Sequence, residues 1–148
     1  MGEQSRVNVG CLKLEVVGKI NSSDEAVILE LLRAHNISNF GQSGRSDLAI
    51  ILRDGGNTIG GLVGYTSRRM LYVSLLFVPA EMRNQGLAGR MLEMAEQEAI
   101  SRNCIGAYLD TMSCDAENFY RKRGYEVFGR LDGFEDALTV AWMKKRLR

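Results

Sequence analysis

The feature that most constrains the fold is an apolar run that leads into a glycine-rich helix start. Met70 to Val78 is almost wholly apolar and ends at Pro79, the only proline in the chain. Such a run indicates a central strand buried on both faces, and proline ends it because proline has no backbone N–H. From Gly86 to about Arg102, apolar residues recur at helical spacing, which predicts a long amphipathic helix.

The rest of the chain predicts an alternation of strands and helices. Ser22 to Glu25 supplies a helix N-cap, and Asp54 to Asn57 is a hairpin turn because glycine and asparagine tolerate positive φ. We expect strands over 11–20, 48–53, 58–66, 70–78, 104–110, 125–131 and 138–143, helices over 22–35, 86–102 and 115–123, and a loop over 36–46. Gly124 closes the last helix.

Length and charge exclude several classes of protein. A chain of 148 residues fits one compact domain, residues 1–148. The formal charge of +1 provides no global field for nucleic acid or an anionic membrane, and no apolar run approaches the roughly 20 residues that cross a bilayer. The N-terminal residues lack the apolar core of a signal peptide. We therefore expect a cytoplasmic protein with neither a nucleic-acid nor a membrane partner.

Cysteine and histidine usage argues against metal and triad chemistry. Cys11, Cys104 and Cys114 are an odd number without C-x-x-C spacing, which indicates neither a disulfide framework nor a zinc site. His35 is the single histidine, which disfavours a Ser-His triad. We expect no metal.

The segment from Leu76 to Arg90 has the character of an anion site. The first turn of a helix has N–H groups without intrahelical partners and a positive dipole end, and Gly86, Ala88 and Gly89 allow close approach to the backbone. The P-loop pattern fails because Gly55-x-x-x-x-Gly60 is followed by Gly61-Leu62. The dinucleotide fingerprint fails because Gly86-x-Ala88 lacks a third glycine at the required spacing.

Two motifs resemble those of the GNAT family of N-acetyltransferases. Arg83-x-x-Gly86-x-Ala88 follows the central strand, and Ala116-x-x-Phe119-Tyr120-x-x-x-Gly124-Tyr125 lies further along the chain. The resemblance implies a mixed α+β fold, with a mostly antiparallel sheet of six to seven strands, a parallel pair splayed at the cofactor site and helices on both faces. It also implies acetyl-CoA as co-substrate.

The resemblance assigns roles to particular residues. Backbone amides of the helix start bind the pyrophosphate, a bulge in the central strand opens its backbone to pantetheine, and an amide there polarises the thioester carbonyl. Tyr120 is the acid that protonates the leaving thiolate; an unperturbed phenol is protonated at neutral pH. The implied cofactor-binding residues are Leu76, Phe77, Val78, Arg83, Asn84, Gln85, Gly86, Leu87, Ala88, Gly89, Arg90 and Asn118, with Lys122 a further candidate for the CoA phosphates.

The acceptor side departs from the family pattern. Ser74 lies on the central strand where many relatives carry an acidic residue, and Ser113 stands where an asparagine often begins the second motif. A water chain, Asp110 and Glu81 stay open as acceptors of the amine proton. The acidic stretch Asp132 to Asp136 either attracts a cationic amine or is a solvated turn.

The sequence as a whole predicts direct acetyl transfer to a primary amine of a small molecule. A protein acetyltransferase acting on a lysine or an N-terminus is the alternative within the class. A CoA-binding regulatory module with weak catalysis is the alternative outside it, suggested by Ser74. Homodimers are common in the family, and the exposed edge of the last strands offers a contact for one.

Overall fold

The computed structural model describes residues 12–133 and 139–148, which form two compact units, one ending at Gln42 and one spanning Ser43–Arg148. In the first unit, the predicted strand over 11–20 is wrong: residues 12–20 are neither helix nor strand, and Cys11 lies outside the described residues. Leu14 and Val16 alternate with polar residues but are fully exposed. Alternation alone makes no strand, because a strand also needs a neighbour for its backbone hydrogen bonds.

Helix α1, Ser22–Phe40, is longer than the sequence predicts. Its N-cap is Asn21, not a serine, and the Asn21 side chain accepts a hydrogen bond of 2.8 Å from the backbone N–H of Asp24. The helix ends at Gly41, whose φ of 73° favours glycine. The predicted loop over 36–46 therefore begins only after Phe40.

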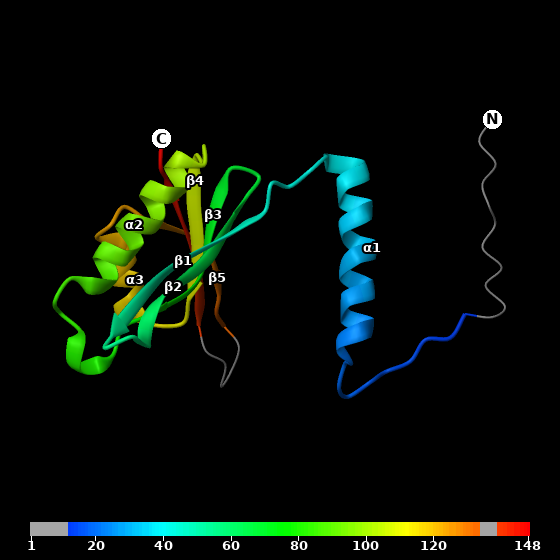
Figure 1. Ribbon diagram of the computed structural model, residues 1–148, viewed down its shortest axis with the longest axis horizontal. Coiled ribbons are helices and arrows are strands. Elements are labelled where there is room, and N and C mark those ends of the chain that lie inside the picture. The colour runs from blue at the N-terminus through cyan, green and yellow to red at the C-terminus, as the bar shows by residue number, and fades with distance from the viewer. Residues whose placement is uncertain (1–11, 134–138) are drawn as a thin grey trace. The chain divides into compact units, whose positions relative to one another are not determined.

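The second unit contains a six-stranded sheet of order β1-β2-β3-β4-β6-β5 (Figure 1). All neighbouring strands are antiparallel except β3 and β4, which are parallel. The strands are β1 Ser46–Asp54, β2 Asn57–Ser67, β3 Met70–Phe77, β4 Gly106–Thr111, β5 Glu126–Leu131 and β6 Val140–Arg146. The predicted mixed, mostly antiparallel sheet is confirmed, with strand ends shifted by up to three residues. Residue 138, where the last strand was expected to start, lies outside the described residues.

Two helices of this unit lie together on one face of the sheet (Figure 1). They are α2, Leu87–Ser101, and α3, Cys114–Arg121. The apolar stripe of α2 is buried as its periodicity predicts, and it shares one core with Leu62, Leu71, Leu109 and Met143 of the sheet. The sheet thereby has a helix-covered face, which holds the core of this unit.

Strand β3 separates from β4 halfway along its length. The parallel pairing runs from Met70 opposite Gly106 to Val73 opposite Leu109 and stops there, although β3 continues to Phe77. The next residue, Ser74, is a bulge against β2, and its hydroxyl donates a hydrogen bond of 2.9 Å to the Val63 carbonyl. We call this opening between β3 and β4 the fork.

The fork corrects one expectation about the central strand. Leu71 and Val73 are buried, but beyond the bulge Leu75 and Phe77 are 63% and 55% exposed. The prediction of a strand buried on both faces is therefore wrong: Leu71, Val73 and Val78 join the core, whereas the residues on the face opposite α2 and α3 lie outside it.

Strand β2 approaches β3 so closely that it requires glycine. A Cβ at Gly64 would lie 2.1 Å from the carbonyl oxygen of Tyr72, and one at Gly60 would lie 2.6 Å from that of Phe77. These are backbone atoms of the neighbouring strand and cannot rotate aside. Because Gly60 and Gly64 have no side chains, β2 can pair closely with β3 on both sides of the bulge.

We expect Gly64→Ala to destabilise the fold by about 1–3 kcal/mol, because the new methyl group must push β2 away from β3. Gly129→Ala in β5 is the matched control: its Cβ would meet only Trp142 at 4.0 Å, so its effect should stay within about 0.5 kcal/mol. Urea unfolding measures both. Equal stability of the two variants would contradict the close approach of β2 and β3.

Candidate functional site

The connection from β3 to α2 builds a helix start with an open N-terminus. Pro79 ends the strand, a 3₁₀ turn spans Ala80–Met82, and Asn84 and Gly86 adopt positive φ of 61° and 78°. Gly86 is the N-cap of α2, and no side chain caps the helix. The first-turn N–H groups and the positive end of the helix dipole are thus available to an anion.

Arg83 fixes this connection to the strand that it leaves. Its Nε donates a hydrogen bond of 3.1 Å to the carbonyl of Val78. That bond spans the turn between the end of β3 and the start of α2, so the strand end and the helix N-terminus are held together.

A cleft of about 580 Å³ collects most of the predicted site residues. Its walls come from the end of β3, the start of α2 and one side of α3. The predicted residues that line it are Leu76, Phe77, Val78, Arg83, Asn84, Gly86, Leu87, Ala88, Gly89 and Tyr120. The two motifs, far apart in the sequence, therefore meet in one cavity.

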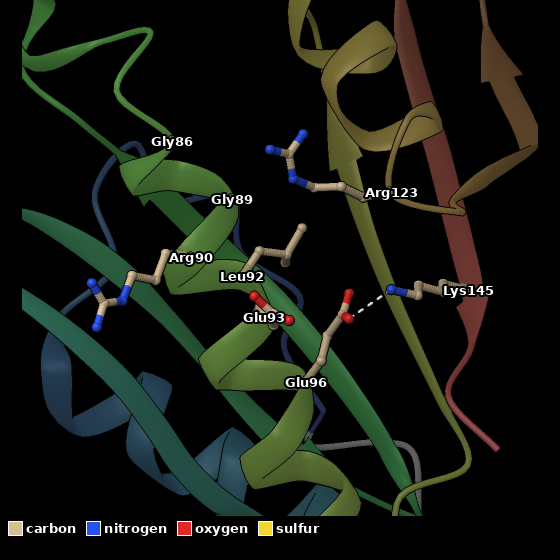
Figure 2. Close-up of a pocket in the computed structure, with 8 residues that line it drawn as sticks. All are labelled: Gly86, Gly89, Arg90, Leu92, Glu93, Glu96, Arg123 and Lys145. Atoms are coloured by element: carbon tan, nitrogen blue, oxygen red, sulfur yellow. Dashed lines mark hydrogen bonds and ion pairs between the residues drawn. The ribbon is translucent and has the colours of Figure 1, made fainter.

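Three predicted residues lie outside that lining. Arg90 lines a neighbouring pocket of about 620 Å³, where its side chain projects from the opposite side of α2 to Arg123 (Figure 2). Gln85 and Asn118 are exposed and line neither pocket. Lys122 is also exposed and outside both.

Arg123 is a cleft residue that the sequence reasoning missed. It lines both pockets, and its guanidinium lies over the start of α2, where a Cβ at Gly89 would come within 2.2 Å of Nη2 (Figure 2). Its Nη1 donates a hydrogen bond of 3.1 Å to the Phe119 carbonyl, and its Cζ lies 3.8 Å from the Phe119 ring centre. The sequence signal that could have identified Arg123 is its position inside the second motif, directly before Gly124.

Tyr120 is buried where α3 meets the sheet, and it lines the cleft. Its ring packs edge-on against Phe119 at 5.0 Å and Tyr125 at 5.6 Å. Burial, assisted by the negative charge of Asp110, raises its pKa to about 12. The phenol therefore stays protonated at neutral pH and can donate a proton.

A buried polar network includes Tyr125, the residue against which Tyr120 packs. The Tyr125 hydroxyl donates to Glu96 Oε1 at 3.0 Å, and the Lys145 ammonium donates to Glu96 Oε2 at 2.6 Å (Figure 2). Burial, and then the Glu96 charge, raises the pKa of Tyr125. Both carboxylate oxygens are satisfied, which a buried carboxylate requires. The network joins α2, the residue directly before β5, and β6.

The acceptor-side candidates lie around the fork and the β3–α2 turn. Asp110 follows the last β4 residue that pairs with β3, and it accepts a hydrogen bond of 2.8 Å from the Tyr72 hydroxyl, which raises the Tyr72 pKa to about 12. Glu81 is exposed on the 3₁₀ turn. Of the acidic stretch, residues 134–136 lie outside the described residues.

Two further expectations concern membranes and metals. Within residues 12–133 and 139–148, no helix is long and apolar enough to span a membrane. Over the same ranges, no group of three or more histidine, cysteine or carboxylate side chains is arranged to hold a metal ion. Cys104 is buried and Cys114 is exposed, both as free thiols, and Cys11 lies outside the described part.

Comparison with known proteins identifies relatives over most of the chain. An acetyltransferase of Agrobacterium fabrum is 46% identical over 123 residues, which cover 82% of this chain and 90% of that protein. The blasticidin-S acetyltransferase of Streptomyces morookaense is 33% identical over 93 residues, covering 62% of this chain and 68% of that enzyme.

The fold has a close counterpart among solved structures. The crystal structure of an acetyltransferase candidate from Agrobacterium tumefaciens superposes with a TM-score of 0.88 at 40% identity, covering 91% of this chain and 99% of that one. The sequence pattern of the acetyltransferase (GNAT) domain matches residues 17–147. The chain therefore belongs to the GNAT family of acetyltransferases.

Proposed function

We propose that this enzyme binds acetyl-CoA in the cleft and transfers the acetyl group directly to a primary amine of a small molecule. The observation that carries the proposal is that the uncapped N-terminus of α2, the fork and Tyr120 all border one cavity. These are an anion site, an opened strand and a proton donor. Together they meet the needs of thioester aminolysis with a phosphorylated co-substrate.

The start of α2 would hold the pyrophosphate of the co-substrate. Backbone amides from Gln85 to Gly89 offer hydrogen-bond donors, and Gly86 leaves their approach open. The expected range to Arg90 is one residue too long, because the Arg90 N–H donates to the Gly86 carbonyl at 3.0 Å. Arg83 and Arg123 border the same end of the cleft and add positive charge. Arg90, on the other side of the helix, is less suited to this role than the sequence suggested.

The second half of β3 would hold the pantetheine arm. Leu76, Phe77 and Val78 line the cleft, and their backbone has no pairing with β4. The groups on that side can therefore pair with an amide-containing chain as a further strand would. A β3 amide N–H near the fork would stabilise the charge that develops on the thioester oxygen.

Tyr120 would complete the transfer as the general acid. Acetyl-CoA supplies an activated thioester, whose carbonyl carbon gains a bond to nitrogen and loses its bond to sulfur. Tyr120 gives its phenolic proton to the departing sulfur, and its raised pKa keeps that proton in place at neutral pH. The amine must lose a proton to a base or to water.

One observation supports a small-molecule acceptor. The relative from Streptomyces morookaense is named for a small molecule, blasticidin S. A cytoplasmic location and a homodimer stay predictions of the sequence.

The first test is a calorimetric titration with acetyl-CoA, CoA and ATP. We expect acetyl-CoA and CoA to bind and ATP not to bind.

Gly86→Glu should weaken acetyl-CoA binding by at least about tenfold, because a carboxylate at the helix start repels the pyrophosphate. Gly55→Glu is the matched control, since Gly55 also has positive φ and open space around it. Unchanged affinity of Gly86→Glu would remove the helix start from the cofactor site.

The second test concerns the acid. Tyr120→Phe should lower kcat by about 100-fold while leaving acetyl-CoA affinity nearly unchanged. Because the Tyr120 pKa is about 12, the defect should be constant from about pH 7 to about pH 10, where the wild-type phenol stays protonated. Steady-state rates across that range measure it. A fully active variant would show that another group protonates the sulfur.

A further inference from the structure

The face of the sheet opposite α2 and α3 has an aromatic cluster beside the fork. Leu71, Val73, Ala107 and Leu109 are buried on the helix-covered face, so the residues between them point to the other face. There Tyr72 and Tyr108 lie with ring centres 4.9 Å apart, and Tyr65 lies 5.4 Å from Tyr72. The cluster ends where β3 and β4 separate.

A carboxylate stands at the edge of this cluster. Asp110 is exposed, follows the last β4 residue paired with β3, and receives the Tyr72 hydroxyl at 2.8 Å. On its other side, Asp110 lies directly opposite Trp142 of β6. Direct cross-strand partners project from the same face of a sheet. A negative charge is thus flanked by a tyrosine and a tryptophan.

Within the described residues of the unit Ser43–Arg148, no cationic side chain pairs with this charge. Lys144, a nearby cation on the same face, pairs with Glu126 at 3.5 Å. The cluster also binds one cation internally, since the Arg45 guanidinium lies 3.6 Å from the Tyr65 ring centre. Aromatic faces with an adjacent carboxylate are a general means of holding an ammonium group.

The position of Asp110 relates this cluster to the cleft. Tyr120 borders the cleft on the helix-covered side, and the Asp110 charge contributes to its raised pKa. The carboxylate is therefore within electrostatic reach of the candidate acid, although it projects from the other face. At the fork, where β3 and β4 are unpaired, no strand pairing separates one face of the sheet from the other.

We propose that Asp110, Tyr72 and Trp142 form the acceptor subsite, and that the acceptor is a cationic amine whose positively charged group is held there. The inference rests on the proposed function, because it supplies the second substrate of the same reaction. The acceptor reaches the fork from the face of the sheet opposite α2 and α3, while acetyl-CoA occupies the helix-covered side. Charge at the acceptor, as well as its shape, then determines which amines are used.

Trp142 allows a direct test because it is the only tryptophan in the chain. Its fluorescence is titrated in the full-length protein with propane-1,3-diamine, a dication, and with 3-aminopropan-1-ol, a monocation of similar length, with and without CoA. We expect the diamine to bind about tenfold more tightly, from the added charge. Asp110→Asn, which keeps an oxygen for the Tyr72 hydroxyl, should weaken diamine binding about tenfold. Asp54→Asn, at the β1–β2 turn, is the matched control.

The outcomes separate this inference from the proposed function. Equal affinities for the two amines, or an Asp110→Asn variant that binds the diamine as the wild type does, would overturn the subsite even if acetyl-CoA binds. Failure of acetyl-CoA to bind would instead overturn the proposed function, and the fluorescence titration without CoA would still decide the subsite. In turnover, Asp110→Asn should raise KM for the diamine and leave KM for acetyl-CoA unchanged.

Discussion

The parallel pairing of β3 with β4 is the interaction on which the rest of the site depends. It lasts for four residue pairs and stops at Val73 and Leu109. Had it continued, the backbone of Leu76 to Val78 would be hydrogen-bonded to β4 and could not bind a ligand. The bulge at Ser74 changes the register of β3 against β2 at the point where β4 is lost, and bulges bend the strand that carries them. The Ser74 hydroxyl bonds to the Val63 carbonyl across the bulge, so the distortion leaves that acceptor satisfied.

A second interaction, the network of Glu96, Tyr125 and Lys145, constrains the position of the candidate acid. A buried carboxylate is costly unless both oxygens are paired, so the network is satisfied only when α2, the start of β5 and β6 adopt one arrangement. That arrangement also sets Tyr120, which packs on Tyr125, relative to the start of α2. The position of the acid and the position of the anion site are thus coupled.

Sequence patterns predicted those features that depend on residues close together in the chain. The turn at Asp54 to Asn57, the helix beginning after Gly86 and the cleft position of Tyr120 depend on neighbouring residues or on one motif. The predicted strand over 11–20 was wrong because pairing is a property of two segments, and alternation describes only one. Arg123 was missed because its role arises from contact with Gly89 on another helix. The neighbours of Asp110 were equally hidden, since strand order brings Tyr72 and Trp142 beside it from distant parts of the chain.

The serine on the central strand gains a physical explanation from the same geometry. An acidic residue there would direct a carboxylate toward the Val63 carbonyl, an acceptor facing an acceptor, whereas serine donates to it. With the bulge stabilised by a hydroxyl, a charge for the acceptor amine must come from a neighbouring strand. Asp110 supplies one at the first β4 position that is not paired with β3. In the proposed subsite the acidic function is therefore moved across the fork rather than lost, and the tyrosine and tryptophan beside it determine which amines can approach.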